Sequence, residues 1–160
     1  MRSKKELSKR LSYLDKFEEP NARLEQYSTD SEIAAEALWF LHMRNEINGK
    51  IIADLGCGNG ILGIGCLLLN AEKVYFVEKD KNALEIAKRN FKNLKLKNGI
   101  FLNIDVSEFI DNVDVVIENP PFGVQKEHAD RIFLNAAMKV SDSIYSFHKV
   151  ESYDFLKKYC

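Results

Sequence analysis

The sequence predicts an α/β fold, with a mostly parallel, doubly wound sheet that carries helices on both faces. After Asn48-Gly49, short apolar runs alternate with segments of helical periodicity, which is the rhythm of βαβ units. The chain has 160 residues, 46% of them hydrophobic, which is enough for one core. We therefore expect one globular unit, made of an N-terminal helical region, 1–48, and a core, 49–160.

The expected elements follow from periodicity and from the residues that break it. Leucines at helical spacing predict a first helix over 5–17, which ends before Pro20. A second helix is expected from about Thr29-Asp30-Ser31-Glu32, with a Thr or Ser hydroxyl as its cap. Strands are then expected at 50–55, 73–78, 99–104, 113–118 and 142–147, and helices at 60–69, 81–93 and 129–140.

The charge of the chain limits how it can bind nucleic acid. A net charge of -1 excludes a protein that coats nucleic acid over its whole surface, so any contact must use local patches. A solvated helix face or a solubilising tail explains each patch equally well. The two basic patches are Arg2, Lys4, Lys5, Lys9 and Arg10, and Lys88, Arg89, Lys92, Lys95 and Lys97.

Cysteine and histidine spacing predicts no metal site. Cys57, Cys66 and Cys160 have no CxxC spacing, and the three histidines stand apart from other ligands. The chain does not begin with an apolar signal segment, and its most apolar run, 61–69, is too short to span a bilayer. We therefore expect a cytoplasmic protein in a reducing compartment.

Polar and glycine residues follow the expected strands at their carboxyl ends, where a parallel sheet binds ligands. The first strand leads into the turn Asp54-Leu55-Gly56-Cys57-Gly58-Asn59-Gly60, whose glycines permit a close approach of the backbone. Glu78 follows the second strand, where an acid can hold ribose hydroxyls. Asp105 follows the third strand, and Asn119 follows the fourth.

The glycine turn alone does not identify the ligand. Gly58, Gly60 and Gly63 also satisfy the GxGxxG pattern of dehydrogenases, which is a weak signal by itself. The acid at Asp54 would repel a pyrophosphate but attract a sulfonium and an ammonium group, and S-adenosylmethionine carries both. The alternative is that Asp54 only caps the turn that follows it.

The stretch Asn119-Pro120-Pro121-Phe122 is suited to activating a poor nitrogen nucleophile, such as an amide or an aromatic exocyclic amine. Acceptors on its two N–H bonds favour the pyramidal geometry that attack requires, and Asn119 and Pro120 each offer a carbonyl oxygen. The prolines keep the segment extended and add no competing N–H. Phe122 can stack on a flat, extruded base.

At these residues the chain resembles the Rossmann-like S-adenosylmethionine-dependent methyltransferases, through DLGCGNG and NPPFG. The stretches LEQYST at 24–29 and YSFHK at 145–149 resemble more narrowly the methyltransferase-like proteins that include the eukaryotic small-subunit rRNA adenine-N6 methyltransferase and its archaeal relatives. NPPF is shared with guanine-N2 and protein-glutamine methyltransferases, so it indicates nitrogen chemistry and not the substrate. The implied activity is N6-adenine methylation in RNA, with rRNA as the expected substrate.

The resemblance also implies roles for single residues. Catalysis would be alignment for in-line methyl transfer, without a metal or a covalent intermediate. The target base would meet Asn119, Pro120 and Phe122, with Pro121 also binding the substrate. The basic charge of the N-terminus separately predicts that Lys4, Lys5, Lys9 and Arg10 bind RNA. The cofactor would be held at its methionine end by Gln26, Tyr27 and Thr29, at its amino acid moiety by Asp54, Gly56, Cys57, Gly58 and Gly60, at its ribose by Glu78, and at its adenine by Asp105 and Val106.

Three residues have a structural explanation beside the functional one. Tyr27 can be a core aromatic, and His148 is better explained as a buried histidine than as a catalytic one. Glu118 is unusual before a base-binding loop; strand alternation points it away from the face of Asn119, so we expect a structural role for it.

The resemblance raises two further expectations. Relatives usually add an antiparallel hairpin after the fifth strand, and we expect this hairpin to be missing here. Eukaryotic relatives bind a small zinc-containing activator along the strand that corresponds to 100–104, which implies a similar partner as a hypothesis. The alternatives to an adenine-N6 enzyme are a guanine-N2 RNA methyltransferase, a protein glutamine methyltransferase, and a catalytically silent RNA-binding domain.

Overall fold

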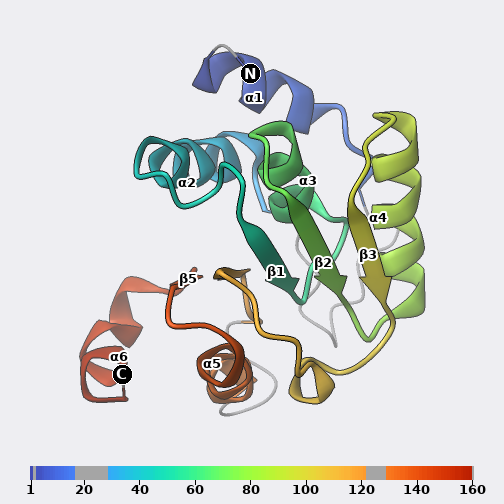
Figure 1. Cartoon of the computed structure of the whole chain (residues 1–160). Helices are drawn as coiled ribbons and strands as arrows, with labels where there is room; N and C mark the ends of the chain where they lie inside the picture. Colours follow the sequence, from blue (N-terminus) through green and yellow to red (C-terminus); the bar gives the residue numbers. More distant parts are fainter. Residues whose placement is uncertain (2, 17–28, 122–128, 160) are drawn as a thin grey trace.

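The computed structural model describes residues 1, 3–16, 29–121 and 129–159. Its centre is a five-stranded, wholly parallel sheet in the order β3-β2-β1-β4-β5. Figure 1 shows β1, β2 and β3 side by side and pointing the same way. The predicted doubly wound fold is confirmed, and the sheet consists of β1 (Ile51–Leu55), β2 (Lys73–Val77), β3 (Gly99–Leu102), β4 (Val115–Glu118) and β5 (Ile144–Ser146).

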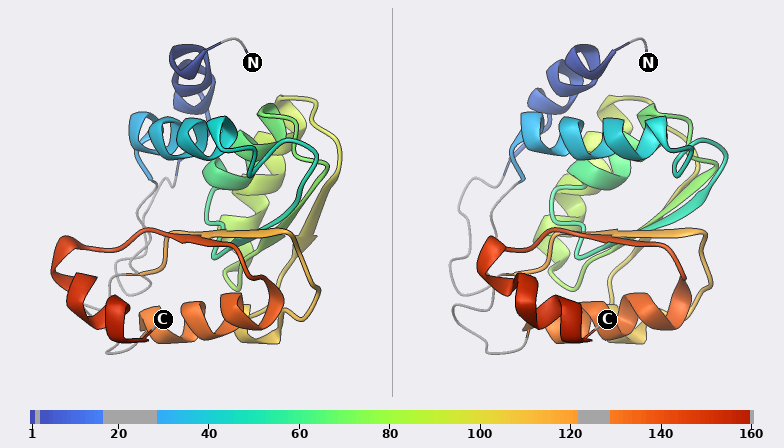
Figure 2. Two further views of the ribbon diagram at one scale, coloured as in Figure 1. Left: turned by 60° about the vertical axis from the view of Figure 1, so that its left-hand side comes forward. Right: turned by 90° about the vertical axis from the view of Figure 1, so that its left-hand side faces the viewer.

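Helices cover both faces of this sheet. One face packs against α2, α3 and α4, with α1 lying on α2 and α3, and the other face packs against α5 (Figure 2). Two short 3₁₀ turns, 106–108 and 150–152, join the remaining elements. The helices are α1 (Lys4–Ser12), α2 (Ser31–Met43), α3 (Ile61–Leu68), α4 (Lys81–Asn93), α5 (Ala129–Val140) and α6 (Tyr153–Tyr159).

Two details of the predicted helices are wrong. The first helix ends at Ser12, so the described part of the expected continuation, 13–16, is not helical. Asp30, and not the neighbouring Thr or Ser hydroxyl, caps α2, because its carboxylate accepts the amides of Glu32 and Ile33 at 2.8 and 3.2 Å. The predicted bounds of α4 and α5 agree with the structure.

The N-terminal helices share the main core with the sheet. Leu7 and Leu11 of α1 and Leu38 of α2 are fully buried in the same cluster as Ile52 of β1 and Phe76 of β2. Burial of each such side chain contributes about 1.5–3 kcal/mol, so the N-terminal helices add to the stability of the sheet. Within the described residues, no helix has the length and apolarity needed to cross a membrane.

The close packing of α3 on the sheet depends on Gly63. A Cβ at this position would lie 2.4 Å from Phe76 Cε1, 2.9 Å from Val74 Cγ1 and 3.0 Å from Asp54 Oδ2. These three neighbours belong to buried residues, so they have little room to move. The absence of a side chain at this position therefore lets α3 lie directly on β1 and β2.

We predict that Gly63→Ala lowers the free energy of unfolding by about 1–3 kcal/mol, because an added methyl group in a packed core forces its neighbours apart. Urea denaturation measures this change. Lys92→Ala, at an exposed position of α4, is the control and should change stability by less than about 0.5 kcal/mol. Equal stability of the two variants would contradict the packing described for α3.

Candidate functional site

The turn after β1 takes a backbone form that glycine adopts readily. Gly56, Gly58 and Gly60 have φ angles of 69°, 54° and 83°, a region that residues with a side chain rarely occupy. The amides of Gly56 and Cys57 donate to the carbonyl of Val77 at 2.8 and 3.0 Å, which fastens the turn to the end of β2. The result is a fixed turn with positive φ angles directly before α3, as the glycines of the sequence predict.

Asp54 lies beneath this turn as a buried acid. Its side chain is 1% exposed, and Oδ2 accepts the amide of Gly63 at 2.8 Å. Desolvation by burial raises the pKa of Asp54 to about 7, although the hydrogen bond from Gly63 opposes that rise. The contact with Gly63 is of the turn-capping kind that was considered from the sequence, and it leaves the role of Asp54 toward a ligand open.

Glu78, at the end of β2, braces the same turn. Its Oε2 accepts the amide of Gly58 at 3.0 Å and its Oε1 accepts the amide of Asp80 at 2.9 Å. Burial raises the pKa of Glu78, while these two backbone donors lower it. The carboxylate therefore lies beside the glycine turn, as expected of a group that holds a ribose.

Asp105 and Val106 follow β3 at the same edge of the sheet. Asp105 caps the 3₁₀ turn, accepting from the amide and hydroxyl of Ser107 at 3.1 and 2.8 Å, and Lys79 Nζ lies 3.7 Å away. Partial burial raises the pKa of Asp105, but the bonds from Ser107 and the charge of Lys79 outweigh it, so the pKa is lowered. Val106 is buried. The acid Asp105 and the apolar side chain of Val106 are therefore adjacent at this edge.

Asn119, the first residue after β4, has an oriented amide with one open acceptor. Its Nδ2 donates to Thr29 Oγ1 at 2.9 Å, across 90 positions of the chain. Its Oδ1 is buried and has no hydrogen-bond partner among the described residues. A buried amide oxygen without a donor is costly, so this atom is explained best by a donor that a ligand brings. Pro120 beside it is buried and Pro121 is half-buried.

The register of the sheet brings Asn119 to the glycine turn. Leu55 of β1 pairs with Glu118 of β4, so the residues that follow the two strands begin side by side. Three predicted site residues, Gln26, Tyr27 and Phe122, lie outside the described residues. Of the predicted RNA-binding residues, Lys4 forms an ion pair with Glu36 of α2, whereas Lys5, Lys9 and Arg10 are exposed.

Sequence reasoning missed a cluster that ties the N-terminal segment to the site. Asn90 of α4 accepts the amide of Asp15 at 2.8 Å and donates to the carbonyls of Asp15 and Asn59 at 3.1 and 3.0 Å. Asn59 of the glycine turn also donates to the carbonyl of Asp15 at 3.1 Å. The signal was a polar residue at a core position of a helix, because Asn90 continues the buried stripe of Ala83 and Ala87.

Glu118 is the remaining buried acid near the site. It is 0% exposed, and its Oε1 accepts the hydroxyl of Ser146 at 2.8 Å. Burial raises the pKa of Glu118 to about 7, against the effect of the bond from Ser146. Among the described residues, no group of three or more His, Cys, Asp or Glu side chains is arranged to hold a metal.

The raised pKa of Asp54 predicts a dependence of stability on pH. The folded protein holds a proton that the unfolded chain releases, so the contribution of Asp54 to stability is complete below about pH 4 and is lost as the pH rises to about 7. Each pH unit in this window corresponds to about 1.4 kcal/mol for one proton. We predict that Asp54→Asn makes unfolding free energies between pH 5 and 7 less dependent on pH, by about 1 kcal/mol or more.

Urea denaturation at pH 5, 6 and 7 measures this slope. Asp111→Asn, at an exposed position, is the matched control and should keep the slope of the unchanged protein. A slope that is the same in all three proteins would mean that Asp54 is not a desolvated acid.

Comparisons with known proteins agree with the fold and show the family. Residues 26–143 match the model of the family described as methyltransferase small domain. The chain is 38% identical to the rRNA N(6)-adenosine-methyltransferase METTL5 of Danio rerio, over 96% of this chain and 78% of that protein. It is 39% identical to the protein MJ0284 of Methanocaldococcus jannaschii, over 99% of this chain and 77% of that protein.

A solved structure extends the agreement to three dimensions. The crystal structure of PH1948 from Pyrococcus horikoshii, which has a provisional description as an RNA methyltransferase, is 45% identical and superimposes with a TM-score of 0.93. The match covers 99% of this chain and 81% of that one. The chain therefore belongs to the methyltransferase small domain family and is an S-adenosylmethionine-dependent methyltransferase of the class I fold.

Proposed function

We propose that this protein transfers a methyl group from S-adenosylmethionine to the exocyclic N6 amine of an adenine in RNA, with rRNA as the substrate. The observation that carries the proposal is the amide of Asn119, which is held at Nδ2 by Thr29 and keeps a buried, unpartnered Oδ1. An exocyclic amine supplies the N–H donor that this oxygen lacks. The likeness to METTL5 of Danio rerio, which is named an rRNA N(6)-adenosine-methyltransferase, supports the choice of adenine and of rRNA.

The residues at the ends of β1, β2 and β3 fit the cofactor chemically. S-adenosylmethionine supplies an electrophilic methyl group on a sulfonium. Asp54 and the turn from Gly56 to Gly60, with Cys57 and Gly58 between them, would hold its amino acid moiety, because the acid and the turn lie together at the carboxyl end of β1. Glu78 would hold the ribose, Asp105 and Val106 the adenine, and Gln26, Tyr27 and Thr29 the methionine end.

The amine would be activated by geometry and not by a strong base. Asn119 Oδ1 and the carbonyl of Pro120 would each accept one N–H of the amine, which turns its lone pair toward the methyl group. An amide such as Asn119 does not take up a proton, so the proton leaves the methylated amine to solvent. Phe122 would stack on the base, and Pro121 would border it.

Thr29 gains a specific function in this arrangement. Its Oγ1 accepts from Nδ2 of Asn119, so the other end of the amide, Oδ1, is the end presented to the substrate. Thr29 also directly precedes the cap of α2, which ties this orientation to the N-terminal region, 1–48. We propose that this region closes over the cofactor and contacts RNA.

The open oxygen of Asn119 does not by itself distinguish adenine from two other nitrogen substrates. A guanine N2 amine and a glutamine amide offer the same N–H donors to Asn119, so product analysis must separate them from adenine. A catalytically silent RNA-binding domain would need no open acceptor beside the glycine turn. The buried, unpartnered oxygen therefore favours an enzyme.

We predict that the protein transfers label from S-adenosylmethionine to rRNA that lacks its own adenine methylation, and that the label is recovered as N6-methyladenosine. Asn119→Ala should lower kcat at least about 100-fold, because it removes a preorganised acceptor for the transition state. Asn112→Ala, at an exposed position before β4, is the matched control and should keep full activity.

Nucleoside analysis by mass spectrometry decides the outcome. Label in N2-methylguanosine or in protein would replace the adenine assignment. An inactive lone chain that becomes active with a small zinc-containing activator would support strand addition at β3, an edge strand whose Ile100 is 38% exposed. Full activity without any stable complex would remove that partner from the proposal.

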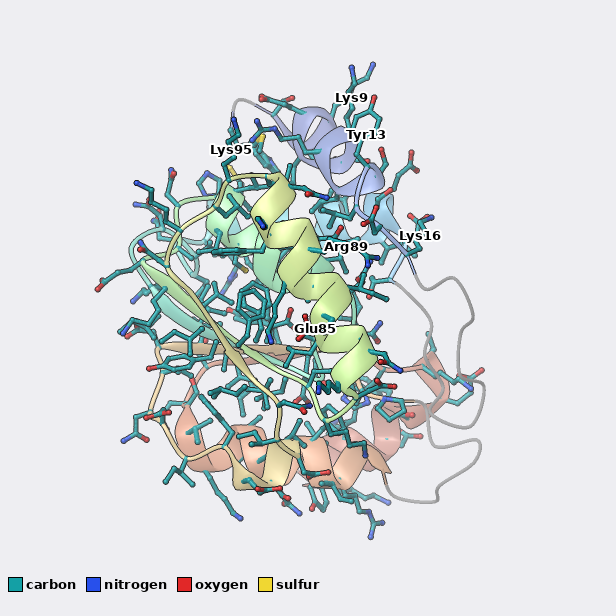
Figure 3. The ribbon with its side chains drawn as sticks, turned by 90° about the vertical axis from the view of Figure 1, so that its right-hand side faces the viewer. Lys9, Tyr13, Lys16, Glu85, Arg89 and Lys95 are labelled. Carbon is teal, nitrogen blue, oxygen red and sulfur yellow. The ribbon has the colours of Figure 1, made fainter. Side chains whose placement is uncertain are left out.

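The two basic patches of the sequence lie on neighbouring elements. Figure 3 shows Lys9, Tyr13 and Lys16 on α1 and the residues after it, next to Arg89 and Lys95 on and after α4. Arg89 Nε pairs with Asp15 at 2.9 Å, which joins the two elements. Tyr13 is 73% exposed, so the face combines cations with an aromatic ring, a pairing suited to RNA.

We propose that this α1–α4 face, together with Lys5 and Arg10, binds RNA phosphates. Neutralising Lys9, Lys92 and Lys95 with Gln should weaken RNA binding and reduce the slope of log K against log salt by about 2–3, roughly 0.7–0.9 for each lost phosphate contact. Fluorescence anisotropy at several salt concentrations measures the slope. The charge-matched control neutralises Lys139, Lys157 and Lys158 on α5 and α6, and an equal effect of both sets would contradict the assignment of the face.

A further inference from the structure

Glu118 is a buried acid for which the proposed chemistry gives no task. It is the last residue of β4, it is 0% exposed, and it directly precedes Asn119. The other buried polar residues of the described chain, Asp54, Asn59 and Asn90, belong to the glycine turn and its support. Glu118 instead faces β5, the neighbouring edge strand.

The contacts of Glu118 form a chain that runs along β5. Glu118 pairs in register with Ser146, whose hydroxyl donates to Oε1 at 2.8 Å. The same hydroxyl oxygen lies 2.7 Å from Nε2 of His148. A hydroxyl has one proton, so a Ser146 that donates to Glu118 accepts from the tautomer of His148 that carries its proton on Nε2.

The backbone repeats the attachment. The carbonyl of Glu118 accepts the amide of Phe147 at 3.0 Å, so the side chain of Glu118 is bonded to the last residue of β5, Ser146, and its main chain to the residue that follows. Beyond Asn119 the chain enters Pro120 and Pro121, which have no N–H to donate to a neighbouring strand. Glu118 thus directly precedes the base-binding segment, and both its backbone and its side chain are hydrogen-bonded to residues 146–147.

We propose that His148, Ser146 and Glu118 form a hydrogen-bond relay that anchors the start of the Asn119–Pro120 segment, and that Ser146 and His148 are therefore positioning residues for methyl transfer. This inference rests on the proposed function, because it assigns the relay to the same amine site. The relay acts by fixing the positions of the Asn119 amide and the Pro120 carbonyl, and it contacts neither cofactor nor base. A small shift of such acceptors costs much of their effect on the transition state.

Stability alone does not explain a carboxyl at this position. Burial disfavours the charged form, and Oε2 of Glu118 is buried with no hydrogen-bond partner in the part of the chain that the structure describes. Replacing a buried polar group of this kind by an apolar side chain of similar size is neutral or stabilising in many proteins. If Glu118 positions the Asn119–Pro120 segment, Glu118→Leu lowers kcat while the protein stays stable. If Glu118 is purely structural, Glu118→Leu leaves kcat unchanged.

The first test separates catalysis from folding. Glu118→Leu and Ser146→Ala should lower kcat about tenfold or more, with KM for S-adenosylmethionine and for RNA changed less than twofold and with Glu118→Leu as stable as the unchanged protein. Glu118→Gln keeps the acceptor for Ser146 and should retain most of kcat. Ser143→Ala, the same substitution at the opposite end of the β4–β5 pair, is the matched control. Unchanged kcat in both Glu118→Leu and Ser146→Ala would overturn the proposal.

The second test does not depend on the substrate. Hydrogen exchange, followed by NMR, should show the amide of Phe147 exchanging about tenfold faster in Ser146→Ala than in Ser143→Ala, because its acceptor on Glu118 is no longer held by the side-chain bond. Equal exchange in the two variants would overturn the anchor. If exchange differs as expected but the unchanged protein does not methylate adenine in rRNA, the anchor is supported and the proposed substrate is wrong.

Discussion

The reversal of strand order between β1 and β4 is the constraint on which the rest of the structure depends. The chain builds β1, β2 and β3 outward in one direction and then returns to place β4 on the other side of β1. The carboxyl ends of β1 and β4 therefore become neighbours, with Leu55 opposite Glu118. This register brings Asp54 of β1 and the glycines after β1 to the Asn-Pro-Pro segment after β4, where we propose a cofactor site beside an acceptor for an amine.

The site is held by buried polar groups whose partners come from distant parts of the chain. Asp54 is satisfied by Gly63, Asn59 by Asp15, and Asn119 at Nδ2 by Thr29. Each of these bonds offsets the cost of removing a polar atom from water. Oδ1 of Asn119 has no partner among the described residues, and the bond from Nδ2 to Thr29 keeps it in place before a substrate arrives. Preorganisation of this kind is how a site without a strong base can favour a transition state.

Local signals made most of the fold predictable. The apolar periodicity of 81–93 and 129–140 gave the bounds of α4 and α5, and the glycines of the first turn indicated its positive φ angles. The hydrogen bonds of Asp15 with Asn59 and Asn90, and the pairing of Glu118 with Ser146, depend on register and on long-range packing. A single sequence does not contain that information. The cap of α2 was misassigned because three adjacent residues can all cap a helix and only geometry selects Asp30.

A crystal structure of the protein with a nonreactive analogue of S-adenosylmethionine and a short RNA containing the target adenine tests the central claim most directly. The account predicts the N6 amine within about 2.7–3.2 Å of both Asn119 Oδ1 and the carbonyl of Pro120. It also predicts that Nδ2 of Asn119 still donates to Thr29 Oγ1 in that complex. An Asn119 amide whose Oδ1 points to a protein donor, with the base bound elsewhere, would contradict the account.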